Sequence, residues 1–139
     1  MLTKSFLAAV CVVNAGSVAL TQTGTQATFP YYNVRNYGAV GDGKALDSPA
    51  IDRAIEACAN AGGGTVFLPA GTYLSGSIHL KSNINLHLDA GAVILGAPQE
   101  MNAYDPPEDF PGIAYQDGGH TYFHNSLIWG EDLRNVSIT

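Results

Sequence analysis

Two short stretches decide the fold class of this chain. Asn83-Ile84-Asn85-Leu86-His87-Leu88 and Asn135-Val136-Ser137-Ile138 each begin with an asparagine and continue as an alternating strand. Alternation of apolar and polar residues is typical of a β-strand with one buried face. Two such strands led by the same residue predict stacked coils of a parallel β-helix, because equivalent corners recur from coil to coil in a solenoid.

Other short β segments surround these two stretches and are separated from them by Gly, Asn or Asp. We expect strands at residues 32–37, 65–68, 77–80, 84–88, 92–95, 127–129 and 136–138. Short strands with frequent turns and no crossover helices suit a sandwich or a solenoid. The repeated asparagine favours the all-β solenoid.

Residues 49–61 form the one segment with a convincing helical pattern. Ser48 is placed to cap this helix, and Pro49 occupies its first position. Four apolar residues recur at helical spacing on one face: Ile51, Ala54, Ile55 and Cys58. The first coil of a solenoid otherwise exposes its interior, so we predict that this helix caps it. Cys58 is then a buried, inert thiol.

The first 19 residues have the features of a secretory signal peptide. Lys4 supplies the positive region, residues 6–13 the apolar region, and Ser17 and Ala19 the small residues of a cleavage site. Residues 20–30 are polar, and we expect a flexible mature N-terminus there. The protein is therefore expected to be secreted, extracellular or periplasmic, without a membrane span. A buried strand or helix, or lipidation at Cys11, are the alternatives.

The composition of the 139 residues fits one domain, which we place at residues 31–139. Apolar residues make up 46% of the chain and charged residues 13%, which excludes a disordered tail. The net charge is -6 and basic residues form no run, so the sequence predicts no nucleic-acid partner.

A glycine-rich stretch at residues 38–45 fits the G-x-x-x-x-G-K pattern of a phosphate-binding loop. It ends in Ala45, however, where a magnesium-binding hydroxyl is required. The predicted helix also begins too late for its N-terminus to hold a phosphate. Nucleotide binding is therefore not favoured, and we expect no cofactor.

The carboxylates of the chain do not form a pattern that predicts catalysis. We interpret five of them as solvated or turn-forming: Asp42, Asp47, Asp52, Glu56 and Asp89. Glu131 and Asp132 follow a predicted strand, and a turn explains them adequately. We assign no catalytic residue.

Aromatic residues and histidines gather in residues 99–125, a long segment with three prolines. Insertions in solenoids project from one face, often the binding face. Tyr122 and His124 are therefore candidates for contact with a sugar substrate, although packing of these aromatics onto the coil is the favoured interpretation. A metal site at His120 and His124 would need a helix, which the neighbouring glycines disfavour, so we predict no metal site.

Several blocks of the sequence carry a resemblance to known families. Residues 32–52, with Asn33-Val34-Arg35-Asn36-Tyr37-Gly38-Ala39-Val40-Gly41-Asp42-Gly43, resemble the entry segment of the pectate-lyase-like right-handed β-helix superfamily. Ala61-Gly62-Gly63-Gly64-Thr65-Val66-Phe67-Leu68-Pro69, Gly76-Ser77-Ile78-His79-Leu80-Lys81-Ser82-Asn83 and Leu127-Ile128-Trp129-Gly130-Glu131-Asp132 are similar to glycoside hydrolase family 28, the polygalacturonase and rhamnogalacturonase group.

The resemblance implies a secreted hydrolase of pectic, galacturonan-type polysaccharides that works by inverting hydrolysis and is monomeric at full length. The family's Asn-Thr-Asp, Asp-Asp, Gly-His-Gly and Arg-Ile-Lys segments do not occur here. The chain is therefore expected to be an N-terminal fragment, inactive alone, that contains the cap helix and first coils only. The alternatives are a noncatalytic carbohydrate-binding or tail-spike-like β-helix, or a lyase or epimerase of the superfamily.

Asn135-Val136-Ser137 is a glycosylation sequon whose occupancy the sequence leaves open.

Overall fold

Short parallel strands arranged in three sheets make up most of the described chain. A computed structural model describes residues 30–107 and 124–139. The first sheet contains β1 (Tyr31–Asn33), β3 (Gly64–Leu68), β6 (Ile84–Leu88) and β9 (Ser137–Ile138). The second contains β2 (Asp42–Leu46), β4 (Gly71–Ser75) and β7 (Ala92–Gly96), and the third contains β5 (Ile78–His79) and β8 (Ile128–Trp129). All the strand pairs are parallel.

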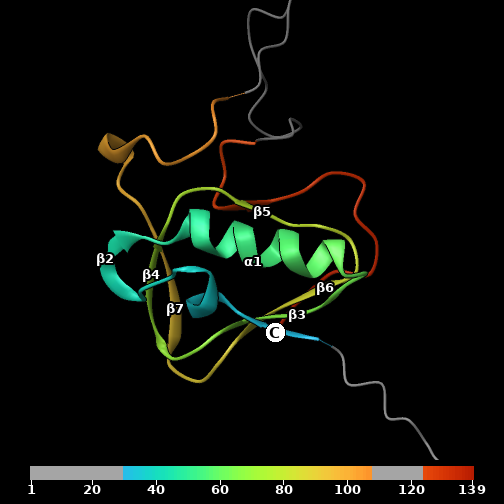
Figure 1. Cartoon of the computed structure of the whole chain (residues 1–139). Helices are drawn as coiled ribbons and strands as arrows, with labels where there is room; N and C mark the ends of the chain where they lie inside the picture. The colour runs from blue at the N-terminus through green and yellow to red at the C-terminus, as the bar shows by residue number, and fades with distance from the viewer. Residues whose placement is uncertain (1–29, 108–123) are drawn as a thin grey trace, which may run out of the picture.

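The order of the strands is that of a coil. β3, β4 and β5 belong to the first, second and third sheets in turn, and β6, β7 and β8 repeat this order. β9 then belongs to the first sheet again. Figure 1 shows β4 and β7 on the left, β3 and β6 below and β5 above, with helix α1 (Ser48–Asn60) lying across them. This arrangement agrees with the predicted parallel β-helix, of which these residues form the first coils.

Asparagines stack at one corner of the coil, as the sequence predicts. Asn85 pairs with Ser137 in the β6–β9 register, so Asn83 and Asn135 occupy equivalent positions. Both have a positive φ, +64° and +55°, a conformation that asparagine tolerates better than most residues. The side-chain amide of Asn135 donates to the side-chain oxygen of Asn83 at 2.9 Å, so the sequon asparagine is engaged in the corner.

Helix α1 buries the predicted face against the coil. Ile51, Ala54 and Cys58 are fully buried and Ile55 is 1% exposed, and all four pack into one core with inward residues of β3, β4, β5 and β6. Burial raises the pKa of the Cys58 thiol, as expected for an inert cysteine.

The start of the helix differs from the prediction. Helix α1 begins at Ser48, and the preceding Asp47 is its N-cap residue. Asp47 makes no side-chain capping bond to the helix, because its carboxylate accepts hydrogen bonds from the backbone amides of Val40 at 2.7 Å and Gly41 at 2.9 Å. Ser48 also has another partner: its hydroxyl accepts from the backbone amide of Gly76. Asp47 is 1% exposed, so its predicted solvated or turn role is wrong in one respect: the side chain is buried.

The glycine-rich loop uses its amides internally. Besides the two amides bound by Asp47, those of Lys44 and Ala45 donate to the carboxylate of Asp42. A phosphate-binding loop must direct such amides toward its ligand. This geometry agrees with the sequence-based argument against nucleotide binding.

Four further elements differ from the sequence-based expectation. The predicted strand at residues 32–37 is right only at its start, since β1 ends at Asn33 and Val34–Tyr37 forms the 3-10 helix η1. The cause is local: the Asn33 side chain accepts from the amide of Arg35, and Gly38 ends the turn with φ +100°. β2 and β4 were not expected as strands: β2 overlaps the glycine-rich loop, and β4 begins at Gly71 directly after a bend. A second 3-10 helix, η2, spans Gln99–Met101.

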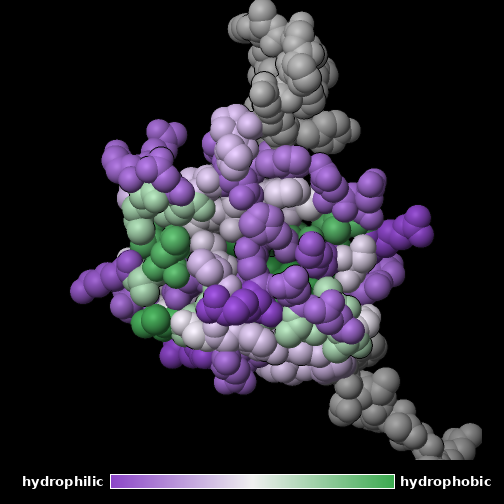
Figure 2. Space-filling view, turned by 45° about the horizontal axis from the view of Figure 1, so that its top comes forward, coloured by the Kyte–Doolittle hydropathy of each residue, from purple (hydrophilic) through white to green (hydrophobic). Residues whose placement is uncertain are grey.

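The outer surface is uneven in polarity. Figure 2 shows hydrophobic side chains gathered on the left, the side of β2, β4 and β7 in Figure 1. The exposed apolar residues of this sheet are Leu46, Val93 and Leu95. Among residues 30–107 and 124–139, no helix is long and apolar enough to cross a membrane.

The cap helix can be tested by comparing its two faces. Ile55→Asp would place a charge in the buried interface, and we expect it to lower the free energy of unfolding by several kcal/mol, on the order of 3 or more. Glu56→Ala changes an exposed residue of the same helix and should cost less than about 0.5 kcal/mol. Urea unfolding of both variants measures the difference. Equal losses would show that α1 does not cap the core.

The buried carboxylate of Asp47 gives a second test. Asp47→Asn keeps the shape of the side chain but replaces one acceptor oxygen with a donor that faces a backbone amide. We expect a loss of about 1–3 kcal/mol in the free energy of unfolding, because a buried amide loses its partner. Asp42→Asn, at an exposed carboxylate that also accepts two backbone amides, is the matched control and should cost clearly less. An Asp47→Asn protein as stable as this control would contradict the argument.

Candidate functional site

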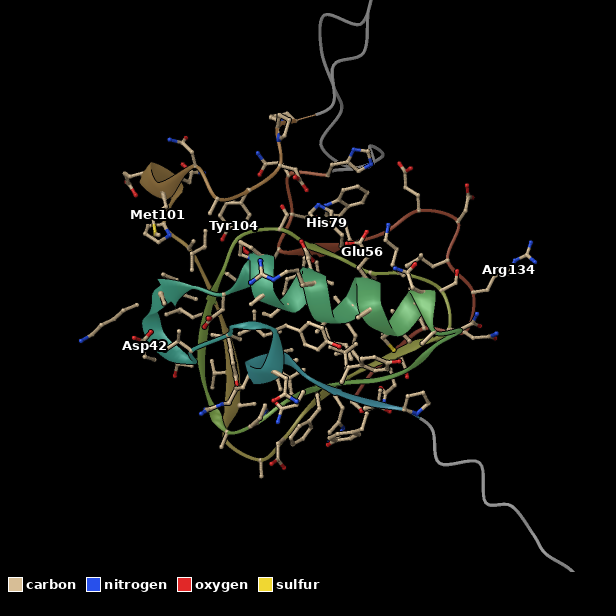
Figure 3. The ribbon with its side chains drawn as sticks, in the orientation of Figure 1. Asp42, Glu56, His79, Met101, Tyr104 and Arg134 are labelled. Atoms are coloured by element: carbon tan, nitrogen blue, oxygen red, sulfur yellow. The ribbon has the colours of Figure 1, made fainter. Side chains whose placement is uncertain are left out.

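Four polar and aromatic side chains meet on the outer side of the third sheet, and we refer to them as the His79 cluster. Asp52 comes from α1, His79 from β5, Asp105 from the segment after η2, and Trp129 from β8. The parallel register pairs His79 directly with Trp129. Figure 3 shows His79 on the same side of α1 as Glu56, with Tyr104 on the neighbouring segment.

His79 bonds to a carboxylate on each side of its ring. Its Nδ1 lies 2.6 Å from Asp52 Oδ2, and its Nε2 lies 2.8 Å from Asp105 Oδ2. Its backbone amide donates to Asp52 Oδ1 at 2.9 Å. The Trp129 ring packs edge-on against the imidazole, with the ring centroids 5.1 Å apart. Asp52 therefore holds both the backbone and the side chain of His79.

Asp105 has partners on three sides. Besides His79, its Oδ2 accepts from the indole nitrogen of Trp129 at 2.7 Å, and its backbone amide donates to the hydroxyl of Ser77 at 3.0 Å. The same hydroxyl donates to the carbonyl of Ser126 at 2.8 Å. Buried Ser77 thus ties residues 105 and 126, which belong to different segments, to the residue preceding β5.

The charges of the cluster shift the pKa values of its members in opposite directions. Desolvation, the largest single influence, lowers the pKa of His79, but the hydrogen bonds and charges of Asp52 and Asp105 together raise it above its ordinary value. Desolvation is also the largest influence on Asp105 and raises its pKa. The hydrogen bonds from Trp129, His79 and Ser77 and the charge of His79 outweigh it, so the pKa of Asp105 lies below its ordinary value.

His124, a candidate from the sequence, lies beside the cluster. Its ring centroid is 4.0 Å from that of Trp129, and its Nε2 is 2.7 Å from Glu131 Oε1. Trp129 therefore contacts two histidine rings, one from His79 and one from His124. Tyr122, the other candidate, and His120 lie outside the described residues. A role for Tyr122 and His124 in substrate contact stays a prediction.

Sequence reasoning missed the cluster itself. Asp52 was expected to be solvated, and this is wrong in part, because its side chain is 29% exposed and hydrogen-bonded to His79. One available signal was that Trp129 is the single tryptophan of the chain and sits in a predicted strand. The pairing of that strand with residues 78–79 was not evident from the sequence.

Hollows border the cluster on two sides. A cavity of about 820 Å³ is lined by residues that include Tyr104, Asp105, Asn125 and Ser126. A smaller one of about 210 Å³ lies between Asp52, Glu56, His79 and Lys81. A third, of about 490 Å³, lies at the asparagine corner, and its lining carries no ionisable side chain. The first two hollows place the cluster within reach of a ligand.

The geometry suits binding better than acid catalysis. Inverting glycosidases need a protonated carboxylic acid and a carboxylate base with room for water between them. Asp52 and Asp105 instead both bond to His79, and the lowered pKa of Asp105 keeps it ionised. Within the described ranges, no group of three or more His, Cys, Asp or Glu side chains is arranged to hold a metal ion.

Comparison with known proteins places the chain in a family. Residues 31–138 match the family described as rhamnogalacturonase A/epimerase, pectate lyase-like. The chain belongs to this family. It is similar to the exo-poly-α-D-galacturonosidase of Dickeya chrysanthemi, with 39% identity over 93 residues, which are 67% of this chain and 15% of the relative.

Two other relatives are named for different functions. A mannuronan C5-epimerase of Azotobacter vinelandii is 46% identical over 63 residues, which are 40% of this chain and 6% of that protein. Plasmin and fibronectin-binding protein A of Streptococcus pneumoniae is 40% identical over 105 residues, 73% of this chain and 14% of that protein. The chain thus spans less than a sixth of the length of each of these three relatives.

Solved structures of exopolygalacturonases share the fold. The hyperthermoactive enzyme from Thermotoga maritima is 34% identical with a TM-score of 0.64, over 78% of this chain and 23% of that one. The family 28 enzyme from Yersinia enterocolitica is 33% identical with a TM-score of 0.59, over 81% of this chain and 20% of that one. The family membership expected from the sequence is confirmed.

The link made by Ser77 can be tested by removing its hydroxyl. Ser77→Ala leaves the Asp105 amide and the Ser126 carbonyl without this partner, and we expect a loss of about 1–3 kcal/mol in the free energy of unfolding. Ser82→Ala is the matched control, because the Ser82 hydroxyl accepts from the Arg134 amide at an exposed position where water replaces it. Urea unfolding followed by Trp129 fluorescence measures both. Equal losses for the two variants would show that Ser77 does not hold the segments together.

Proposed function

We propose that this chain is the N-terminal part of a secreted hydrolase that cleaves pectic, galacturonan-type polysaccharides by inverting hydrolysis on a right-handed β-helix. One observation carries the proposal. The galacturonosidase relative aligns over 67% of the chain, and two exopolygalacturonase structures superpose over 78% and 81% of it. The epimerase aligns over 40% only. Similarity that extends through the later coils favours the hydrolases over the epimerases, since the entry segment is shared more widely.

In this proposal the described residues bind and support, and the cleaving carboxylates lie elsewhere in the protein. Helix α1 closes one end of the coil. Trp129 of β8 contacts His124 of the preceding segment, and Asn125, Ser126 and Leu127 between them line a cavity of about 820 Å³. Aromatic rings pack well against the apolar faces of sugars, and a few polar groups fix the orientation of the ligand. His124 and Trp129 are therefore proposed to contact a sugar unit at the edge of the substrate site.

A second candidate function has its own support. Plasmin and fibronectin-binding protein A covers more of the chain than the galacturonosidase does, 73% against 67%. A noncatalytic binding solenoid would use the same cap and coils without any cleaving carboxylates. The two functions differ in what they bind, and this difference can be measured.

The proposal predicts that the 139-residue chain binds polygalacturonate and releases no reducing ends from it. Trp129→Ala should weaken binding about tenfold, because one aromatic contact contributes about 1 kcal/mol or somewhat more. Tyr31→Ala, which removes an aromatic residue that is 58% exposed on the first sheet, is the control and should leave binding unchanged. Affinity electrophoresis in gels containing polygalacturonate measures the binding, and a reducing-sugar assay measures cleavage.

Each other outcome points to a different function. Release of reducing ends by the chain alone would show that its 139 residues include the catalytic ones, and would overturn the placement of the cleaving carboxylates elsewhere in the protein. Products that absorb ultraviolet light would indicate a lyase. Binding of fibronectin without binding of any polysaccharide would favour the adhesin-like solenoid and overturn the hydrolase proposal.

A further inference from the structure

We propose that His79 is a proton-dependent positioning residue: as an imidazolium it ties the cap helix to the segment that carries Asp105, and its deprotonation loosens the face formed by Trp129. The inference rests in one respect on the proposed function, because the consequence for polysaccharide binding applies to that same face. The tie itself depends only on the geometry of the cluster.

The geometry requires a proton on both ring nitrogens. Nδ1 and Nε2 each lie within 2.8 Å of a carboxylate oxygen, and an ionised carboxylate only accepts hydrogen bonds. A neutral imidazole has one N–H and one lone pair. In the neutral form, therefore, either the contact to Asp52 or the contact to Asp105 sets a lone pair against a carboxylate oxygen. Only the imidazolium satisfies both contacts.

The charges around the ring come from each of the packed elements. Helix α1 contributes Asp52 and Glu56, the segment after η2 contributes Asp105, and Lys81 follows His79 on its own segment. Beyond Trp129 lies the pair of His124 and Glu131. Asp52 and Asp105 are the two groups bonded directly to the ring. Loss of the His79 proton therefore leaves two carboxylates facing a neutral ring.

The contact to Asp105 is the one we expect to break. Asp52 is held to His79 by a second bond from the backbone amide, which does not titrate. Asp105 instead bonds to His79 through the ring alone, and its other partners, Trp129 and Ser77, belong to β8 and the residue before β5. Deprotonation should therefore release Asp105 from the cap helix and alter the packing of His79 against the Trp129 ring.

The direction of the pH dependence follows from the two pKa shifts. Because the pKa of His79 is raised, its tie is complete below about pH 6.5 and is lost as the pH rises through the raised value. Because the pKa of Asp105 is lowered, the stabilisation that its ionised carboxylate contributes is complete above about pH 3.8. It is lost as the pH falls through the lowered pKa. The tie is therefore strongest in weakly acidic solution.

The consequence for the proposed function concerns an anionic polysaccharide. Above the His79 transition the face carries one positive charge less beside Asp52, Asp105 and Glu56, and a polyanion is repelled more strongly. The packing of His79 against the Trp129 ring also changes. We expect polygalacturonate to bind about tenfold or more tightly at pH 5.5 than at pH 8.5, since a coupled shift of one pKa unit corresponds to a factor of ten.

The protonation state can be measured directly. In ¹⁵N-resolved NMR of the histidine rings of the full chain, we expect His79 to keep both ring protons at pH 5.5 and to lose one with a midpoint above 6.5. Trp129 is the only tryptophan of the 139 residues, so its fluorescence reports on this face alone. The Trp129 fluorescence should change with the same midpoint as the titration of His79. His79→Gln should abolish that transition, whereas His124→Gln should preserve it.

Two carboxylate variants separate the tie from a general charge effect. Asp52→Asn removes a bonded carboxylate and should move the His79 midpoint down by about one pH unit. Glu56→Gln removes the same charge four residues along α1, without a hydrogen bond to the ring, and should move the midpoint clearly less. A neutral His79 ring at pH 5.5, or equal shifts for both variants, would overturn the proposal.

Binding measurements distinguish this inference from the proposed function. If polygalacturonate fails to bind at any pH while the His79 and Trp129 transitions occur together, the proton-dependent tie stands and the proposed function fails. If polygalacturonate binds equally at pH 5.5 and 8.5 while His79 titrates, the link between the tie and binding is overturned. Binding whose pH dependence disappears in His79→Gln would support both.

Discussion

The fold depends on a buried carboxylate at the point where the chain changes from loop to helix. Asp47 binds the amides of Val40 and Gly41, and its own amide donates to the carbonyl of Leu74 in β4. Buried amides need partners, since one left without a hydrogen bond costs about 1–3 kcal/mol. One residue therefore fixes the glycine-rich loop through its side chain, and joins the start of α1 to the second sheet through its backbone amide. The helix can cap the coil only because its start is held there.

The sequence predicted what local pattern and repetition control. Helix α1 was expected within one residue of its bounds, because Ile51, Ala54, Ile55 and Cys58 recur at helical spacing. The asparagine corner was expected because Asn83 and Asn135 lead similar strands. Elements without such periodicity were missed. β4 contains a buried Tyr73 between Gly71 and Ser75, and it pairs with β2 and β7, contacts that its short sequence does not reveal.

The candidate site could not be read in the same way, because its members are far apart in sequence. Hydrogen bonds join His79 to residues 27 positions before and 26 positions after it, and no motif spacing connects them. They meet because β5 and β8 are in register and α1 lies alongside. His124 was singled out as a candidate because aromatic residues gather near it in the sequence. Asp52 was assigned to solvent, since a carboxylate on the polar face of a helix is usually hydrated.

Helix α1 links the stability of the fold to the chemistry of the site. Ile51 and Ile55 of this helix fill the end of the core, while Asp52, between them in sequence, turns to the third sheet and holds His79. A rigid helix cannot move one of these faces without the other. The position of His79 is thus fixed by the packing of the cap, and the bond through which it reaches Asp105 is the weaker, proton-dependent one. A change of pH should therefore act on the outer face of the third sheet and leave the core beneath it packed, since the interior is close-packed and has no equivalent alternative arrangement.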